Sequence, residues 1–162
     1  MTSHHHRVNA GFTLIEILVT VAIVGVMASI TLPMMELTTQ RVKEQELRSA
    51  LREIRTALDA YRMAVQEGRI THSSSMSGYP TDLGALTKGI VDARNPNDSK
   101  IYFLRRIPRD PFSPDKDLAA EEQWGLRSYS SSADEPEEGE DVFDIYSRSA
   151  GTGLNGIAYR EW

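Results

Sequence analysis

The chain has 162 residues, 40% of them hydrophobic, which suits one modest folded domain. It contains no cysteine, and this excludes disulfides, thiolate zinc sites and a cysteine nucleophile. Its net charge of −5 offers no overall basic surface for phosphate backbones, so nucleic-acid binding is not expected.

Residues 1–11 are interpreted as a leader peptide on the cytoplasmic side. This segment is short and polar, carries Arg7 without any acid, and ends at the small residue Gly11. The run of histidines at 4–6 invites a metal-binding interpretation. Adjacent histidines near a chain end lack the geometry of a specific site, so a solvated tail or a tag remnant is favoured.

The stretch from Phe12 to Met35 predicts a transmembrane helix. Its only charge is Glu16, and the uncharged part that follows spans about 28 Å as a helix, close to the hydrocarbon thickness of a bilayer. Arg7 should remain cytoplasmic, which directs the rest of the chain outward. A secretory signal peptide is the nearest alternative, but its small residue would follow the apolar run, whereas Gly11 precedes it.

Pro33 lies inside this apolar stretch. Proline removes one backbone donor and crowds the preceding helical turn, so a kink is expected there. Both an ordinary bend of a membrane helix and a functional hinge are compatible with it.

Residues 36–68 predict an amphipathic continuation of the same helix. Apolar residues recur at alternating spacings of four and three, which places them on one stripe: Leu47, Leu51, Ile54, Leu58, Tyr61 and Val65. No capping break precedes the stripe, so one long helix is expected from about Leu14 to about Gln66, ended by Gly68. The stripe should be buried on the remaining residues. A two-stranded coiled coil is the alternative, disfavoured because the stripe is short.

Residues 69–162 predict a globular part with a short helix, loops and antiparallel strands. A short helix should follow Pro80, capped by Thr81 or Asp82. Segments 126–130 and 142–147 alternate apolar and polar residues and should pair as strands.

The acidic loop 134–141 joins these two strands and is interpreted as a solvated connection. The expected fold class is α+β, in which a long N-terminal helix packs on a small C-terminal antiparallel sheet.

Glu16 is the residue that a plain membrane anchor does not explain. A carboxylate inside an apolar helix costs about 2.5–3.5 kcal/mol on insertion scales. Since it follows Phe12 by only four residues, it could reach the membrane interface by itself. The alternative is a cationic partner at the same depth in another subunit.

The run GFTLIE at 11–16, with a short basic leader before it and an apolar helix after it, resembles the type III signal of type IV pilins and type II secretion pseudopilins. The resemblance implies that a prepilin peptidase cuts between Gly11 and Phe12 and methylates the new amino group of Phe12. It also implies that Glu16 neutralises this amino group, in its own or a neighbouring subunit, during assembly.

The later segments resemble the major pseudopilin most, at 79–86, at the turn 106–111 and at 143–147. This implies a pilin-like fold and a single-pass protein of the bacterial inner membrane, with a cytoplasmic N-terminus and a periplasmic C-terminal domain. After assembly it would form a periplasmic filament that drives protein export. The implied partners are copies of itself, minor pseudopilins, the inner-membrane assembly platform, the prepilin peptidase and membrane lipid.

Major pseudopilins usually hold a calcium ion in the loop after their last strand. The corresponding loop here, 149–156, contains no acid, although calcium prefers a cage of hard oxygen ligands. Asp141, Asp144 and Asn155 are the residues that could still contribute to a calcium site.

Two alternatives to a major filament subunit stand beside this interpretation. One is a minor type IV pilin or minor pseudopilin; the other is a membrane-tethered periplasmic binding module or enzyme. The sequence offers no nucleophile paired with a base and no Gly-rich phosphate loop, and His72 lies in a Ser-rich segment. A structural role rather than catalysis is therefore expected.

Overall fold

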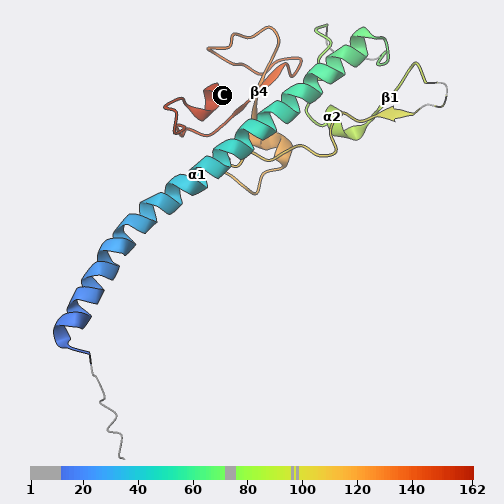
Figure 1. The fold of residues 1–162 in the computed structure, drawn as a ribbon. Helices are drawn as coiled ribbons and strands as arrows, with labels where there is room; N and C mark the ends of the chain where they lie inside the picture. Colours follow the sequence, from blue (N-terminus) through green and yellow to red (C-terminus); the bar gives the residue numbers. More distant parts are fainter. Residues whose placement is uncertain (1–11, 72–75, 96, 98) are drawn as a thin grey trace, which may run out of the picture. The chain divides into compact units, whose positions relative to one another are not determined.

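The computed structural model describes residues 12–71, 76–95, 97 and 99–162, with the backbone alone at 30–34. The chain divides into two compact units, Met1–Gln40 and Arg41–Trp162. Helix α1 (Leu14–Gln66) belongs to both units (Figure 1), and its bounds confirm the single long helix predicted from the sequence.

The end of α1 is set by glycine. Gly68 has a φ of +67°, a conformation that side chains with a Cβ rarely adopt. The N–H groups of Gly68 and Arg69 donate to the carbonyls of Val65 and Ala64, each at 2.9 Å, so two of the last helical acceptors are satisfied. The stop predicted at this glycine is confirmed.

The predicted apolar stripe of α1 forms one side of the core. Five of its six side chains are at most 5% exposed, and the sixth packs beside them: Leu47, Leu51, Ile54, Leu58, Tyr61 and Val65. The C-terminal part of the chain supplies the other side, through Leu86, Leu104, Trp124, Ile145 and Tyr159. The stripe is therefore buried within its own chain, as predicted.

The strand pair predicted around the acidic loop is present with shifted bounds. Strand β3 (Trp124–Arg127) pairs antiparallel with β4 (Asp144–Ser147), with Leu126 opposite Ile145. The observed α+β architecture confirms the predicted fold class.

A second, two-residue pair was not predicted: β1 (Ile90–Val91) pairs antiparallel with β2 (Lys100–Ile101), as a sheet separate from β3 and β4. Two 3-10 helices follow along the chain, η1 (Ala120–Gln123) and η2 (Tyr159–Glu161).

The short helix expected after Pro80 is α2 (Ala85–Lys88). Of the two proposed capping residues, Asp82 makes the contact, because its carboxylate accepts from the N–H of Ala85 at 3.0 Å. The carbonyl of Leu86 then accepts from the N–H groups of Phe103 and Leu104, which ties the segment after β2 to this helix.

Candidate assembly site

The N-terminal end of α1 is capped by Thr13. The N–H of Glu16 donates to the Thr13 hydroxyl at 3.3 Å and to the Thr13 carbonyl at 3.1 Å. Thr and Glu three residues apart form the sequence pattern of a capping box, and an acid in the first turn interacts favourably with the helix dipole. Glu16 is thus placed at the positive end of the helix, a role that the sequence interpretation missed although the Thr-x-x-Glu spacing signals it.

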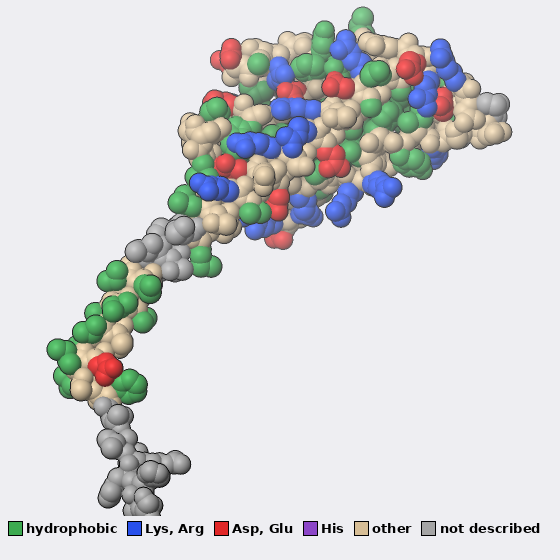
Figure 2. Space-filling view, viewed as in Figure 1, with side chains coloured by type: hydrophobic (Ala, Val, Ile, Leu, Met, Phe, Trp, Pro, Cys, Tyr) green, Lys and Arg blue, Asp and Glu red, His purple; other side chains and the backbone are tan. Residues whose placement is uncertain are grey.

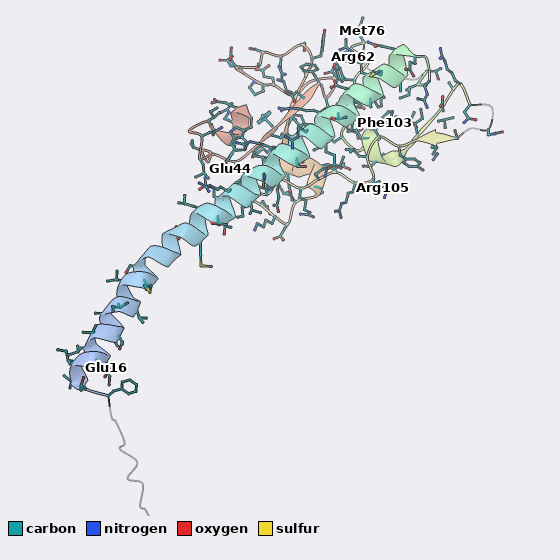
Figure 3. The ribbon with its side chains drawn as sticks, in the orientation of Figure 1. Glu16, Glu44, Arg62, Met76, Phe103 and Arg105 are labelled. Carbon is teal, nitrogen blue, oxygen red and sulfur yellow. The ribbon has the colours of Figure 1, made fainter. Side chains whose placement is uncertain are left out.

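The described N-terminal part of α1 exposes apolar side chains at successive positions. From Phe12 to Met27 the large hydrophobic residues are 50% to 79% exposed. Figure 2 shows them along this part of the helix, and Figure 3 identifies the carboxylate among them as Glu16. Because successive residues point in different directions around a helix, this surface requires an apolar environment on several sides.

The hydroxyl groups on this part of α1 bond to their own helix. Thr20 donates to the carbonyl of Ile17, and Ser29 donates to that of Gly25, each at 2.9 Å. A hydroxyl bonded in this way needs no water, so it is tolerated in a lipid or protein interior. The Glu16 carboxylate is therefore the main polar group on this surface that an apolar environment would leave unfavourable.

Several predicted features lie outside what the structure describes. Gly11 and the rest of the leader are outside the described residues, as is His72. The backbone is helical at Pro33, but the side chains of 30–34 are not described, so the predicted kink stays a prediction. Within the described residues, no helix is both long enough and apolar enough to cross a membrane. The transmembrane span predicted for 12–35 is thus not confirmed.

In the unit Arg41–Trp162, Glu44 fixes the last loop to α1. Its side chain is 5% exposed, and its Oε1 accepts from the N–H of Leu154 at 2.7 Å and from the hydroxyl of Tyr159 at 3.2 Å. The ring of Tyr159 stacks on Phe112 with centroids 4.1 Å apart, and Trp162 packs edge-on against it. A buried carboxylate thus positions the segment in which the family resemblance would place calcium.

Arg55 fixes β4 and the C-terminal residue to the same helix. Its guanidinium donates to Asp144 at 2.7 Å, to the carbonyl of Ile145 at 3.2 Å and to the oxygen of Trp162 at 2.8 Å. The second carboxylate oxygen of Asp144 accepts from Arg127 at 3.1 Å. Both oxygens of Asp144 are therefore held by arginines.

The three residues considered for calcium do not fit a calcium ion. Asp144 is neutralised by two guanidinium groups, and Asp141 accepts from the N–H of Tyr129 at 2.8 Å. Asn155 accepts from the N–H of Ile157, inside its own loop. In the described part of the chain no group of three or more His, Cys, Asp or Glu side chains is placed to hold a metal ion.

The proline-punctuated turn at 106–111 is held by a buried carboxylate. Asp110 accepts from the N–H of Phe112 at 2.8 Å and from the hydroxyl of Ser147 on β4 at 2.6 Å. The indole of Trp124 donates to the carbonyl of Pro108 at 2.9 Å. These bonds fix the turn against both strands of the β3–β4 sheet.

A further ion pair joins the end of α1 to the β1–β2 hairpin. Both Arg69 Nε and Nη2 donate to Asp92 Oδ2, at 3.1 Å and 2.8 Å. This hydrogen bonding to Arg69 lowers the pKa of the Asp92 carboxyl below its usual value. The pair therefore holds Asp92 in its ionised form.

Residues 6–32 match the family model described as prokaryotic N-terminal methylation motif. The chain is 31% identical over 137 residues to type II secretion system core protein G of Pseudomonas aeruginosa, covering 83% of this chain and 91% of that protein. It is 30% identical to the protein of the same name from Dickeya chrysanthemi, covering 74% and 73% respectively. No solved structure gives a significant match.

Proposed function

The chain belongs to the family of type II secretion system core protein G, and we propose that it is the major pseudopilin that builds the periplasmic filament of such a system. The observation that carries this role is the apolar surface at 12–29, which the chain leaves exposed around a single carboxylate. A helix that is apolar on all sides needs lipid or other helices around it. A filament core of packed copies supplies the latter.

Before assembly, this helix would anchor the chain in the inner membrane. The internally bonded hydroxyls of Thr20 and Ser29 support insertion, because they leave no donor unsatisfied in lipid. Arg7 supports a cytoplasmic N-terminus, and the unit Arg41–Trp162 would then lie in the periplasm.

Processing by a prepilin peptidase between Gly11 and Phe12 would give Glu16 its partner. Cleavage exposes an amino group on Phe12, one residue before the capping Thr13. A positive amine at the N-terminal end of a helix is disfavoured by the helix dipole, and both charges are costly alone in an apolar environment. Glu16 compensates for both effects, whether the amine is its own or belongs to a neighbouring copy.

The test uses the full chain in its host, with Glu16→Ala compared with Glu36→Ala as a matched control. Glu36 lies on the same helix, beyond the apolar surface, and is exposed. We expect Glu16→Ala to lose filaments because about 2.5–3.5 kcal/mol of charge compensation disappears at each subunit. Glu36→Ala should assemble normally.

Filament yield is measured by electron microscopy and by shearing, and the N-terminus by mass spectrometry. Filaments of normal yield from Glu16→Ala would refute the proposed pairing. Filament subunits that still carry residues 1–11 would refute the processing step. A mature N-terminus at methylated Phe12 is the expected result.

The major subunit is favoured over a minor pilin or minor pseudopilin because the relatives are named as the core protein of the system. Those names denote a component of a secretion apparatus, which also supports a structural role over that of an enzyme or binding module. A major subunit should make up most of the protein in purified filaments. The proposed partners are copies of the chain, minor pseudopilins, the assembly platform, the peptidase and membrane lipid.

A further inference from the structure

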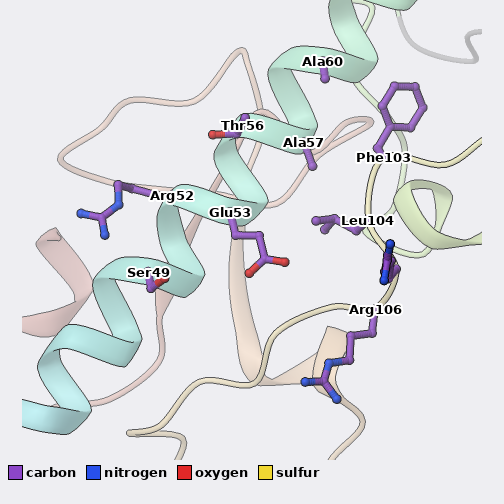
Figure 4. Close-up of a pocket in the computed structure, with 10 residues that line it drawn as sticks. Ser49, Arg52, Glu53, Thr56, Ala57, Ala60, Phe103, Leu104 and Arg106 are labelled. Atoms are coloured by element: carbon purple, nitrogen blue, oxygen red, sulfur yellow. The ribbon is translucent and has the colours of Figure 1, made fainter.

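A groove with a volume of about 790 Å³ lies between α1 and the segment 103–106. Its charged lining consists of Arg52 and Glu53 from the helix and Arg105 and Arg106 from the segment (Figure 4). Three arginines against one glutamate give this site, here called the arginine groove, a positive potential in a chain whose net charge is −5. Thr56 lines the same groove on the helix side.

The arginines of the groove are available for a partner. Arg52, Arg105 and Arg106 are exposed and form no ion pair with any described residue. Guanidinium groups are well suited to carboxylates because they can bind both oxygens at once. The charged part of the groove therefore suits an acidic peptide segment, and Ala57, Ala60, Phe103 and Leu104 supply apolar contacts beside it.

The acidic loop 134–141 presents such a segment. Its five acids from 134 to 140 are exposed, and of these Glu138 alone has an ion pair among the described residues, with Arg148. The loop has a fixed base, because the carbonyl of Glu137 accepts from the N–H of Ser128 at 2.9 Å and the buried Asp141 accepts from that of Tyr129. It is thus an anchored projection that carries unpaired carboxylates.

The groove and the acidic loop do not meet within one copy. In Figure 1 the loop between β3 and β4 lies across α1 from the segment after β2, and Figure 3 labels Arg105 on that far side. Two complementary surfaces on different sides of one chain can bind each other between neighbouring copies. The loop of each copy then contacts the groove of the next copy, and its own groove holds the loop of the copy before it. Such a contact is heterologous, and it extends into an open helical array unless the rotation closes a ring.

We propose that the acidic loop 134–141 of one copy docks into the arginine groove of a neighbouring copy. This inference rests on the proposed filament role and adds to it a second contact outside the apolar helix. Since the charges are exposed, the contact contributes partner choice and register more than raw affinity, and it weakens in high salt.

Engineered cysteines can test the contact, because the chain has no cysteine of its own that could form other disulfides. Thr56→Cys places a thiol in the groove, and Ala133→Cys places one at the exposed position just before the loop. The full chain carrying both, oxidised in intact cells, should give a ladder of disulfide-linked multimers. The control combines Ala133→Cys with Gln66→Cys. Gln66 is exposed at the end of α1, about 15 Å along the helix from Thr56, so this pair should give no ladder.

Charge reversal separates docking from chance proximity of the two thiols. In the chain with both cysteines, Arg105→Glu with Arg106→Glu should lower the ladder yield at least tenfold. Adding Glu135→Lys with Glu137→Lys to that chain should restore it. All four side chains are exposed, and folding of each variant is verified by tryptophan fluorescence.

Each outcome decides one of the two proposals. Filaments without a ladder, or a ladder that is indifferent to charge reversal, overturn the docking and leave the filament role standing. A charge-dependent ladder from a chain that builds no filaments supports the docking and overturns the filament role. The absence of both overturns both.

Discussion

Replacing Glu44 with alanine should loosen the C-terminal loop more than any single surface change on α1. The Glu44 carboxylate accepts from the N–H of Leu154 and from the hydroxyl of Tyr159, and it is 5% exposed. Glu44→Ala removes both bonds and leaves space beneath the stacked rings of Tyr159 and Phe112. The loop at 151–159 should then loosen from the helix before the rest of the unit unfolds, while Arg55 still holds Trp162.

The magnitude follows from these two bonds. Hydrogen bonds to a charged acceptor contribute about 1.5–3 kcal/mol each. Leu154 is 42% exposed, so its N–H regains water and the loss there is small, whereas the hydroxyl of Tyr159 loses an acceptor in a buried position. We expect a loss of about 2–3 kcal/mol in the free energy of unfolding, which for a unit of this size lowers the midpoint by roughly 8–12 °C.

Thermal unfolding of the detergent-solubilised chain, followed by tryptophan fluorescence, measures this effect. Both tryptophans lie in the unit Arg41–Trp162, and Trp124 is fully buried, so the signal reports on the unit that Glu44 stabilises. The matched control is Glu46→Ala, an exposed acid two residues away, which should shift the midpoint by less than about 2 °C. Equal shifts for the two variants would refute the anchoring role of Glu44.

Three further outcomes are expected. Because Arg69 lowers the pKa of Asp92, the pair stabilises the fold above the unfolded pKa of about 3.9, and this contribution is lost as pH falls through the folded value. Asp92→Asn should therefore lower the unfolding midpoint at pH 7 and approach wild type near pH 3; a constant difference would contradict this. Gly125→Ala should destabilise by about 1–3 kcal/mol because a Cβ there overlaps the ring of Tyr146. Truncating that ring to alanine should remove the added cost in a double-mutant cycle. Chelation by EDTA should leave the midpoint unchanged, because arginines already hold both oxygens of Asp144; a drop that calcium reverses would refute this.

The long helix and its buried face could be predicted because they rest on periodicity. Spacings of four and three residues from Leu47 to Val65 specify one face, and Gly68 specifies an end by its backbone freedom. The burial of Glu44 was not predicted, although Glu44 lies three residues before Leu47 and so continues the same face of the helix. An acid on a helix is usually solvated, and only the tertiary contacts with Leu154 and Tyr159 reveal that this one is buried.

Short elements and charged contacts were harder to predict, because they depend on residues distant in sequence. The two-residue strands β1 and β2 are too short for any alternation to be visible. Likewise, the sequence does not reveal that Asp144, considered there as a possible calcium ligand, pairs with Arg55, which lies 89 positions earlier in the chain. The Thr13 cap, by contrast, follows a local pattern and was predictable.

The hydroxyls of Thr20 and Ser29, each bonded to its own helix, have a consequence for subunit exchange. Moving this stretch from a bilayer to a bundle of proteins and back breaks none of their hydrogen bonds, so the two surroundings differ little for it. In the proposed filament role, the balance between the membrane-anchored and the assembled subunit then depends mainly on Glu16. A single ionisable group can in this way make extraction of the helix from the bilayer reversible, because the remaining apolar surface has a similar free energy in both surroundings.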